Sequence, residues 1–221
     1  MALEHESISG MTRSGKSYGA AARGRRHTGP LLVIDPQDSP CWPWPRADRY
    51  NSAAEVIESG RRGGVVYVPA WNDRQGRAEV ALLVAEVFEA AKRAGAQAGR
   101  AGRAWLVICD EAQVYAPEGG APGGLHYIAR QGLRWGVQGV FVSQRPADIA
   151  KSVLSQAVRH YIYEPGEFGA PYFERYGIPG EEVRRLLSDG RQKFAARAAG
   201  GAGPWPYVVW EKGRLSGPYH A

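Results

Sequence analysis

The sequence predicts an α/β domain built around a mainly parallel β-sheet. Short apolar runs alternate with stretches of helical periodicity along the whole chain, which is the pattern of strands joined by helical crossovers. With 221 residues and 44% hydrophobic content, the chain is long and apolar enough to bury a full core. We therefore expect residues 1–221 to form one domain.

The strands of this sheet are predicted from short runs rich in β-branched or aromatic residues. These runs are residues 31–34, 65–68, 105–109, 140–143 and 161–163. Residues 4–8 are predicted to be the first strand, although they are unusually polar for a central position.

Helices are expected between the strands. Residues 78–94 carry Val80, Leu83, Val87 and Ala91 on one face, which is a helical period. Further helices are expected at residues 125–135, 147–157, 168–176 and 180–187. Residues 193–196 and 207–210, separated by a Gly/Ala stretch, are predicted to form a terminal hairpin at the sheet edge.

Composition restricts the cell compartment and the partners. The formal charge of +6 suits a polyanion, with nucleic acid as the leading candidate. No apolar run approaches the ~20 residues that a membrane-spanning helix needs, and the N-terminus carries acids where a signal peptide carries bases. Cys41 and Cys109 are far apart and form no ligand-like pair, which argues against a zinc site. We expect a cytoplasmic protein.

The most informative segment is Gly10-Met11-Thr12-Arg13-Ser14-Gly15-Lys16-Ser17. Its Gly-x-x-x-x-Gly-Lys-Ser spacing is that of a P-loop, in which glycines let backbone N–H groups close around phosphate. Lys16 is expected to reach the terminal phosphates and the Ser17 hydroxyl to bind Mg²⁺. Tyr18 continues into a helix-forming stretch, so residues 10–18 are predicted to bind a nucleoside triphosphate.

Asp110 and Glu111 follow the apolar run at residues 105–109. In P-loop enzymes the first acid after such a strand holds the magnesium shell, and the next can polarise an attacking water. We therefore expect Asp110 to bind Mg²⁺ together with Ser17, and Glu111 to be the catalytic base.

Gln144 ends the strand predicted at residues 140–143, just before Pro146. Because the carboxyl ends of parallel strands share one edge, Gln144 is expected to face the same crevice as Gly15 and Asp110, as a sensor of the γ-phosphate or the water. A cation for the transition state is still needed, and oligomeric motors take it from a neighbouring subunit. Arg130 and Arg134 are the candidates.

Four segments together resemble the HerA/FtsK superfamily of DNA-pumping ATPases. They are residues 8–17, residues 33–36, the Asp110–Glu111 pair, and residues 142–149, which include the Ser143-Gln144-Arg145-Pro146 sequence. The most specific part of the resemblance is residues 130–137, which lead into that last strand. Within that superfamily the chain looks most like the genome-packaging ATPases of membrane-containing icosahedral viruses. One departure concerns Gly132-Leu133-Arg134, where relatives commonly have Gly-Arg.

This resemblance implies a RecA-like core that uses ATP and Mg²⁺. It also implies a hexameric or pentameric ring of identical chains around double-stranded DNA, docked on a capsid vertex or an inner-membrane protein. Arg23, Arg25 and Arg26, after the P-loop helix, are candidate phosphate contacts or ordinary helix-end cations. Residues 40–45, rich in Pro and Trp, are predicted to form an interface.

Three other functions stay open on the sequence. A filamentous-phage-type assembly or secretion ATPase would share the same motifs. A P-loop small-molecule kinase would need an acceptor pocket and a lid with clustered arginines. A nucleotide-dependent scaffold would not hydrolyse ATP, which the presence of Glu111 disfavours.

Overall fold

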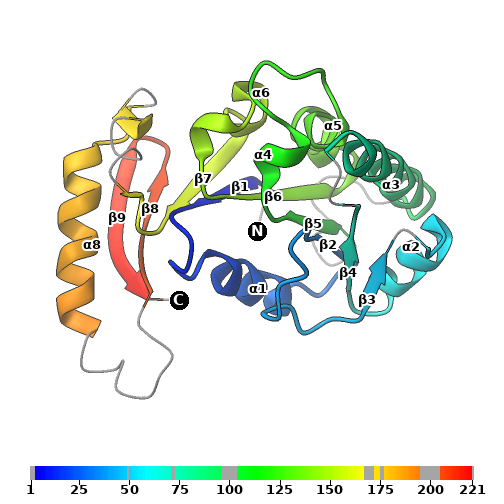
Figure 1. Cartoon of the computed structure of the whole chain (residues 1–221), viewed down its shortest axis with the longest axis horizontal. Helices are drawn as coiled ribbons and strands as arrows, with labels where there is room; N and C mark the ends of the chain where they lie inside the picture. Colours follow the sequence, from blue (N-terminus) through cyan, green and yellow to red (C-terminus); the bar gives the residue numbers. More distant parts are fainter. Residues whose placement is uncertain are drawn as a thin grey trace.

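In the computed structural model of the chain, the described residues are 3–48, 50–70, 73–95, 104–166, 172–174, 177–194 and 205–220. Within them, the strands form one nine-stranded sheet in the order β3-β4-β2-β5-β6-β1-β7-β8-β9 (Figure 1). The strands are β1 (His5–Ser9), β2 (Leu31–Ile34), β3 (Arg46–Asp48), β4 (Val65–Val68), β5 (Trp105–Cys109), β6 (Val137–Ser143), β7 (Ala157–Ile162), β8 (Pro206–Glu211) and β9 (Arg214–His220).

Strands β1 to β7 are all parallel, and β8 and β9 add an antiparallel hairpin at the β7 edge. The predicted α/β class, parallel sheet and C-terminal edge hairpin are confirmed. The helices are α1 (Lys16–Arg26), α2 (Ala53–Arg61), α3 (Asp73–Arg93), α4 (Ala112–Tyr115), α5 (Gly124–Gln131), α6 (Lys151–Leu154) and α8 (Gly180–Phe194), with 3-10 turns η2 (Gly132–Trp135) and η3 (Pro146–Asp148).

Helices cover both faces of the parallel sheet, and the side chains of β5 show how the core is divided. Trp105, Val107 and Cys109 join one apolar cluster, which is covered by α2, α3 and α5. Leu106 and Ile108 alternate with them and join a second cluster, on the opposite face, with α1. Figure 1 shows α1 on one side of the strands and α3 and α5 on the other. The sheet is thus buried on both faces, which explains the continuous apolar runs.

The polar first strand is stabilised by partners on its neighbours. All of His5–Ser9 is buried. Glu6 forms ion pairs with Arg23 of α1 and Arg159 of β7, and the Ser7 hydroxyl lies 2.8 Å from His160 Nδ1. Buried charges are tolerated when they are paired in this way. Arg23 is therefore engaged inside the fold, whereas Arg25 and Arg26 are exposed on the last turn of α1.

The helix predicted at residues 147–157 is wrong in extent. Only Lys151–Leu154 is α-helical, because Ile149 forms an antiparallel bridge with Pro117 and Ala157 already pairs with His5 as the start of β7. Its apolar residues Val153 and Leu154 are buried as expected for a helix. Sheet pairing at both ends limits the segment to one turn.

The end of the chain also differs from the prediction. The partner of β8 is β9, and Lys193 and Phe194 belong to α8, which extends beyond the predicted residues 180–187. Of the helix predicted at residues 168–176, the structure describes only 172–174, which are helical, and the rest lies outside the described residues. Helix α8 packs on the hairpin through Val183 and Leu187, which share a cluster with Val208.

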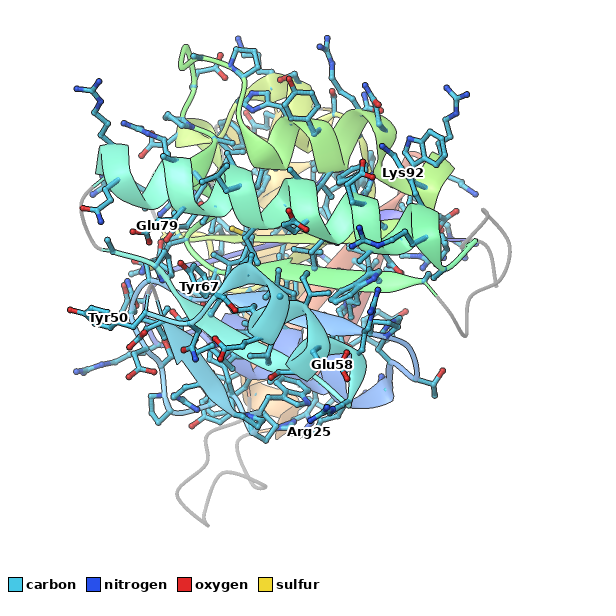
Figure 2. All side chains as sticks on the ribbon, turned by 90° about the vertical axis from the view of Figure 1, so that its right-hand side faces the viewer. Arg25, Tyr50, Glu58, Tyr67, Glu79 and Lys92 are labelled. Carbon is cyan, nitrogen blue, oxygen red and sulfur yellow. The ribbon has the colours of Figure 1, made fainter. Side chains whose placement is uncertain are left out.

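Two elements near the β3 edge were not anticipated, β3 itself and α2. Ser52 caps α2 by accepting a hydrogen bond from the Glu55 amide, while the Glu55 carboxylate accepts one from the Ser52 amide. This capping box could have been read from the Ser-x-x-Glu spacing. On the same side, Glu79 of α3 accepts a hydrogen bond from the Ala70 amide at 2.9 Å and lies near Tyr67, as Figure 2 shows.

The Pro- and Trp-rich loop at residues 40–45 packs on its own chain, and its predicted interface role stays a prediction. Trp42 is 2% exposed and donates a hydrogen bond from Nε1 to Asp35 at 2.8 Å. Trp44 packs against the same cluster as α1. Among the described residues, no helix has both the length and the apolar character to cross a membrane.

Candidate nucleotide-binding site

The P-loop connects β1 to α1 at the carboxyl edge of the sheet. Gly10 and Gly15 have φ angles of 153° and 90°, which glycine adopts without strain. Lys16 is buried, and its Nζ donates a hydrogen bond to the Met11 carbonyl at 2.8 Å, across the loop. Burial lowers the pKa of the Lys16 ammonium. The ammonium thus lies at the centre of the anion-binding loop, where a phosphate would stabilise its charge.

Ser17 and Asp110 meet at the start of α1. The Ser17 hydroxyl donates to Asp110 Oδ2 at 2.8 Å, joining the P-loop to the end of β5. Burial, followed by the nearby Asp35, raises the pKa of Asp110 to about 7. A buried carboxylate with a second acid close by favours a cation, and the hydroxyl and carboxylate oxygens are ligands that Mg²⁺ accepts. The pair therefore fits Mg²⁺.

No group of three or more acidic, histidine or cysteine side chains that could hold a metal occurs in the part of the chain that the structure describes. A P-loop magnesium site does not require one. Mg²⁺ keeps several waters and usually combines one or two protein ligands with the phosphates of the substrate.

Glu111 is held in position by surrounding amides. Its backbone has φ 50°, an uncommon left-handed conformation for a residue with a side chain. Oε1 accepts hydrogen bonds from Gln144 Nε2 at 2.5 Å and Gln37 Nε2 at 3.1 Å, and Oε2 accepts one from Gln113 Nε2. Backbone strain persists where surrounding structure fixes it, often at functional sites. Glu111 thus has a defined orientation.

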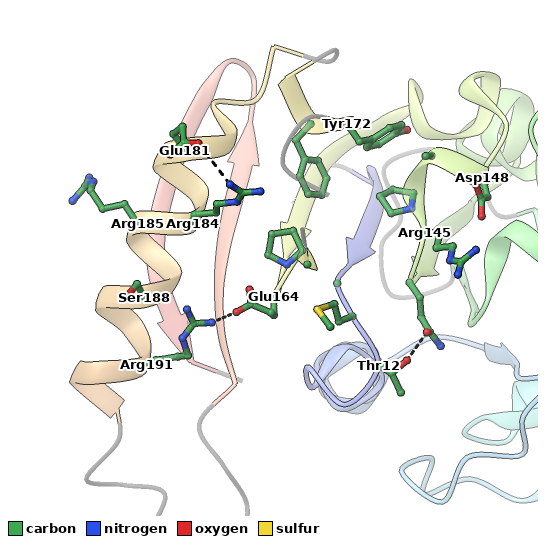
Figure 3. A pocket seen from close by; sticks show the side chains of 18 residues that line it. Thr12, Arg145, Asp148, Glu164, Tyr172, Glu181, Arg184, Arg185, Ser188 and Arg191 are labelled. Carbon is green, nitrogen blue, oxygen red and sulfur yellow. Dashed lines mark hydrogen bonds and ion pairs between the residues drawn. The ribbon is translucent and has the colours of Figure 1, made fainter. Parts of the chain in front are cut away.

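Gln144 links Glu111 to the P-loop. While its Nε2 donates to Glu111, its Oε1 accepts a hydrogen bond from the Thr12 hydroxyl at 2.5 Å (Figure 3). The site residues predicted after β1, β5 and β6 therefore lie together at the carboxyl edge of the sheet. Their catalytic roles stay predictions.

The sequence interpretation missed Gln37 and Gln113 as parts of this cluster. Gln37 follows β2, and its position depends on Asp35, which accepts hydrogen bonds from the Gln37 amide at 2.9 Å and the Ser39 amide at 2.6 Å. Gln113 lies in α4, and its Oε1 accepts from the Ser143 hydroxyl at 2.7 Å. The polar residues that follow β2 were the only sequence signal for Gln37. They lie at the site because β2 is adjacent to β5, which the sequence does not show.

Arg130 and Arg134 lie away from this cluster. Arg130 is in the last turn of α5 and Arg134 is in η2, just before β6 begins, and both are exposed. Gly132, between them, lies beside His5 at the amino end of β1. Neither arginine belongs to the site of its own chain, so a role in the site of a neighbouring subunit stays a prediction.

A large cleft adjoins the P-loop on its α8 side and has a volume of about 1350 Å³ (Figure 3). Met11, Thr12 and Gln144 line one side of it, and Arg184, Ser188 and Arg191 of α8 line the other. Arg191 pairs with Glu164, whose carbonyl accepts a hydrogen bond from the Met11 amide at 2.7 Å. Helix α8 is thus connected to the P-loop through one residue.

Comparisons with known proteins agree with this geometry at the level of the fold. The genome-packaging NTPase B204 from Sulfolobus turreted icosahedral virus 2, solved with ATP-γ-S, superposes with a TM-score of 0.67 over 98% of both chains, at 16% identity. The chain has the fold of B204. The DNA-packaging ATPase B204 from Sulfolobus turreted icosahedral virus gives a TM-score of 0.63 over 100% of both chains, at 15% identity.

A third structure, similar to this chain with a lower TM-score, is the pCW3 conjugation coupling protein TcpA with ATP-γ-S. It has a TM-score of 0.53 and 13% identity, over 99% of this chain and 60% of TcpA. No protein-family model matches the sequence. A search of curated protein sequences finds no match. The resemblance to packaging ATPases is therefore confirmed at the level of the fold.

Proposed function

We propose that this protein hydrolyses ATP with Mg²⁺ and uses the energy to move double-stranded DNA into a viral capsid. The observation that carries the proposal is the hydrogen-bonded line Thr12–Gln144–Glu111, which joins the P-loop to an oriented carboxylate next to the Ser17–Asp110 pair. The B204 fold supports the packaging role, because B204 is a genome-packaging NTPase.

In this proposal each residue has a defined task. Backbone N–H groups of the P-loop bind the α- and β-phosphates, and the Lys16 ammonium binds the β- and γ-phosphates. Ser17 and Asp110 would hold Mg²⁺, which neutralises phosphate charge when bound. Glu111 orients a water molecule and accepts its proton as the water oxygen attacks the γ-phosphorus and the bond to the β–γ bridging oxygen breaks. ADP and phosphate are the products.

The hydrogen bonds of Gln144 would change with the presence or absence of the γ-phosphate. Its amide group contacts both Glu111 and Thr12, so a γ-phosphate that displaces the Thr12 hydroxyl changes the orientation of Glu111. Lys16 donates one hydrogen bond to the Met11 carbonyl, and its ammonium has further N–H groups that can bind phosphate. Binding and release of the γ-phosphate thereby alter the P-loop and the carboxyl edge together.

In a ring of identical chains, a neighbouring chain supplies the cation that stabilises the transition state of hydrolysis. The described carboxyl edge carries no arginine from α5 or η2, so Arg130 or Arg134 of one chain would complete the site of the next. Such a cation raises turnover by about 10³ to 10⁵. The formal charge of +6 suits a duplex passing through the ring.

An assay of phosphate release from MgATP, with and without double-stranded DNA over a salt series, tests this function. We expect hydrolysis that DNA stimulates at low salt, with stimulation that declines as salt rises because phosphate contacts are lost. Lys16→Ala should nearly abolish hydrolysis, and Tyr50→Ala, an exposed change between β3 and α2, should leave it intact. Hydrolysis that DNA never stimulates would favour the assembly-ATPase alternative. ADP formation that requires a hydroxyl acceptor and releases no free phosphate would favour a kinase.

A further inference from the structure

We infer that Tyr18 and Trp205 form an aromatic surface on which the base of the nucleotide stacks. The inference rests on the proposed ATP site and extends it to the other end of the nucleotide. Trp205 immediately precedes β8, so the C-terminal hairpin supplies part of the site.

The two rings are stacked on each other beside the P-loop. Their centroids are 4.8 Å apart and their planes differ by 19°. Trp205 also lies directly against the loop backbone, because a Cβ added at Gly15 would collide with the indole ring. The left-handed φ of Gly15 and this close approach both require glycine there. The hairpin thus contacts the phosphate-binding loop itself.

The aromatic pair lies where the ribose and base of a nucleotide extend from a P-loop. The loop and the first turn of the following helix cradle the α- and β-phosphates with backbone N–H groups. Tyr18 lies in that first turn, next to Ser17. The ribose and base attached to the α-phosphate must therefore leave the loop near Tyr18 and the adjacent Trp205.

The exposure and anchoring of the pair suit base binding. Tyr18 is 49% exposed although it is a large aromatic residue, so ring surface is open to solvent. Trp205 is partly buried against the cluster that contains Ala20 and Ala21 of α1, and its ring also lies against Gly15. The indole is therefore fixed before any nucleotide binds, and less side-chain entropy is lost on binding.

Stacking on a flat ring surface sets the expected specificity. Every base has a π-face, so an aromatic surface binds bases without reading their hydrogen-bonding groups. We therefore expect MgATP and MgGTP to bind with similar affinities. Inorganic tripolyphosphate lacks a base and should be insensitive to the aromatic pair.

The test is calorimetric titration of MgATP, MgGTP and magnesium tripolyphosphate into the wild type and four variants. Trp205→Ala and Tyr18→Ala should each weaken both nucleotides by roughly tenfold or more, from the loss of stacking, and leave tripolyphosphate unchanged. Trp205→Phe should retain most of the affinity. Tyr50→Ala, which removes a tyrosine that is 81% exposed between β3 and α2, is the matched control and should change nothing.

Two results would overturn the inference. Equal weakening of ATP and tripolyphosphate would show that the pair only supports the P-loop, and an unchanged ATP affinity in Tyr18→Ala and Trp205→Ala would show that the base binds elsewhere. A wild type that binds neither ATP nor tripolyphosphate would instead refute the proposed ATP site. Tyr18→Ala keeps the test valid if Trp205→Ala does not fold, since Tyr18 is at the surface.

Discussion

The side-chain amide of Gln37 donates a hydrogen bond to Glu111 Oε1 across 3.1 Å. The two residues are far apart in sequence and meet because β2 lies next to β5 in the sheet. Gln37 shares Oε1 with Gln144, so the carboxylate is held from both sides. The loop after β2 is therefore part of the candidate catalytic site.

Gln37→Ala should lower the rate of ATP hydrolysis by about tenfold with little change in ATP affinity, because Glu111 loses orientation but the P-loop is untouched. Steady-state kinetics would separate kcat from KM. Gln75→Ala, a change at an exposed glutamine of α3, is the control. A rise in KM alone would assign Gln37 to nucleotide binding instead.

Asp35 should matter mainly for stability. It is completely buried and accepts hydrogen bonds from the Gln37 and Ser39 amides and from Trp42 Nε1. Asp35→Ala leaves the buried Trp42 Nε1–H and two part-buried amides without an acceptor, so the free energy of unfolding should fall by about 3 kcal/mol. Trp42→Phe, which removes one donor, should lower the free energy of unfolding by less than Asp35→Ala does. Urea denaturation measures both, and an Asp35→Ala variant as stable as the wild type would contradict this account.

His5 predicts a pH dependence of stability. The pKa of its imidazole is lowered from 6.5 to about 4 by burial, while its Nδ1 accepts a hydrogen bond from the Gly139 amide at 2.9 Å. The unfolded chain therefore binds a proton more readily than the folded one. The contribution of neutral His5 to the free energy of unfolding is complete above pH 6.5 and declines as the pH falls towards 4. The decline is about 2 kcal/mol between pH 7 and pH 5.

His5→Asn tests this dependence, because its side-chain oxygen can accept the Gly139 hydrogen bond but does not titrate in this range. The difference in unfolding free energy between wild type and variant should shrink or reverse as the pH falls from 7 to 5. A difference that stays constant over this range would show that His5 does not titrate as proposed.

The sequence predicted the buried strands and missed the edge of the sheet. Strands β2, β4 and β5 are continuous apolar runs because both of their faces are covered. Strand β3 has only Ala47 between Arg46 and Asp48, so no hydrophobic pattern identifies it. Residues 147–157 had helical spacing, but pairing of Ile149 and Ala157 with other segments overrode it.

The site was predictable where the motif residues follow strands. Asp110 and Gln144 lie at the same edge as Lys16 because parallel strands share their carboxyl ends. Gln37 was not predictable, since the adjacency of β2 and β5 cannot be read from local patterns. The contact of Trp205 with Gly15 was missed for the same reason, because it depends on where the hairpin joins the sheet.

The most direct test of the central claim is a single-turnover measurement of phosphate release from bound MgATP by Glu111→Gln, with the wild type as reference. If Glu111 positions and deprotonates the attacking water, the variant should bind MgATP as tightly as the wild type and release phosphate about a thousandfold more slowly. Phosphate release at the wild-type rate from bound MgATP would contradict the claim that this carboxylate is the catalytic base.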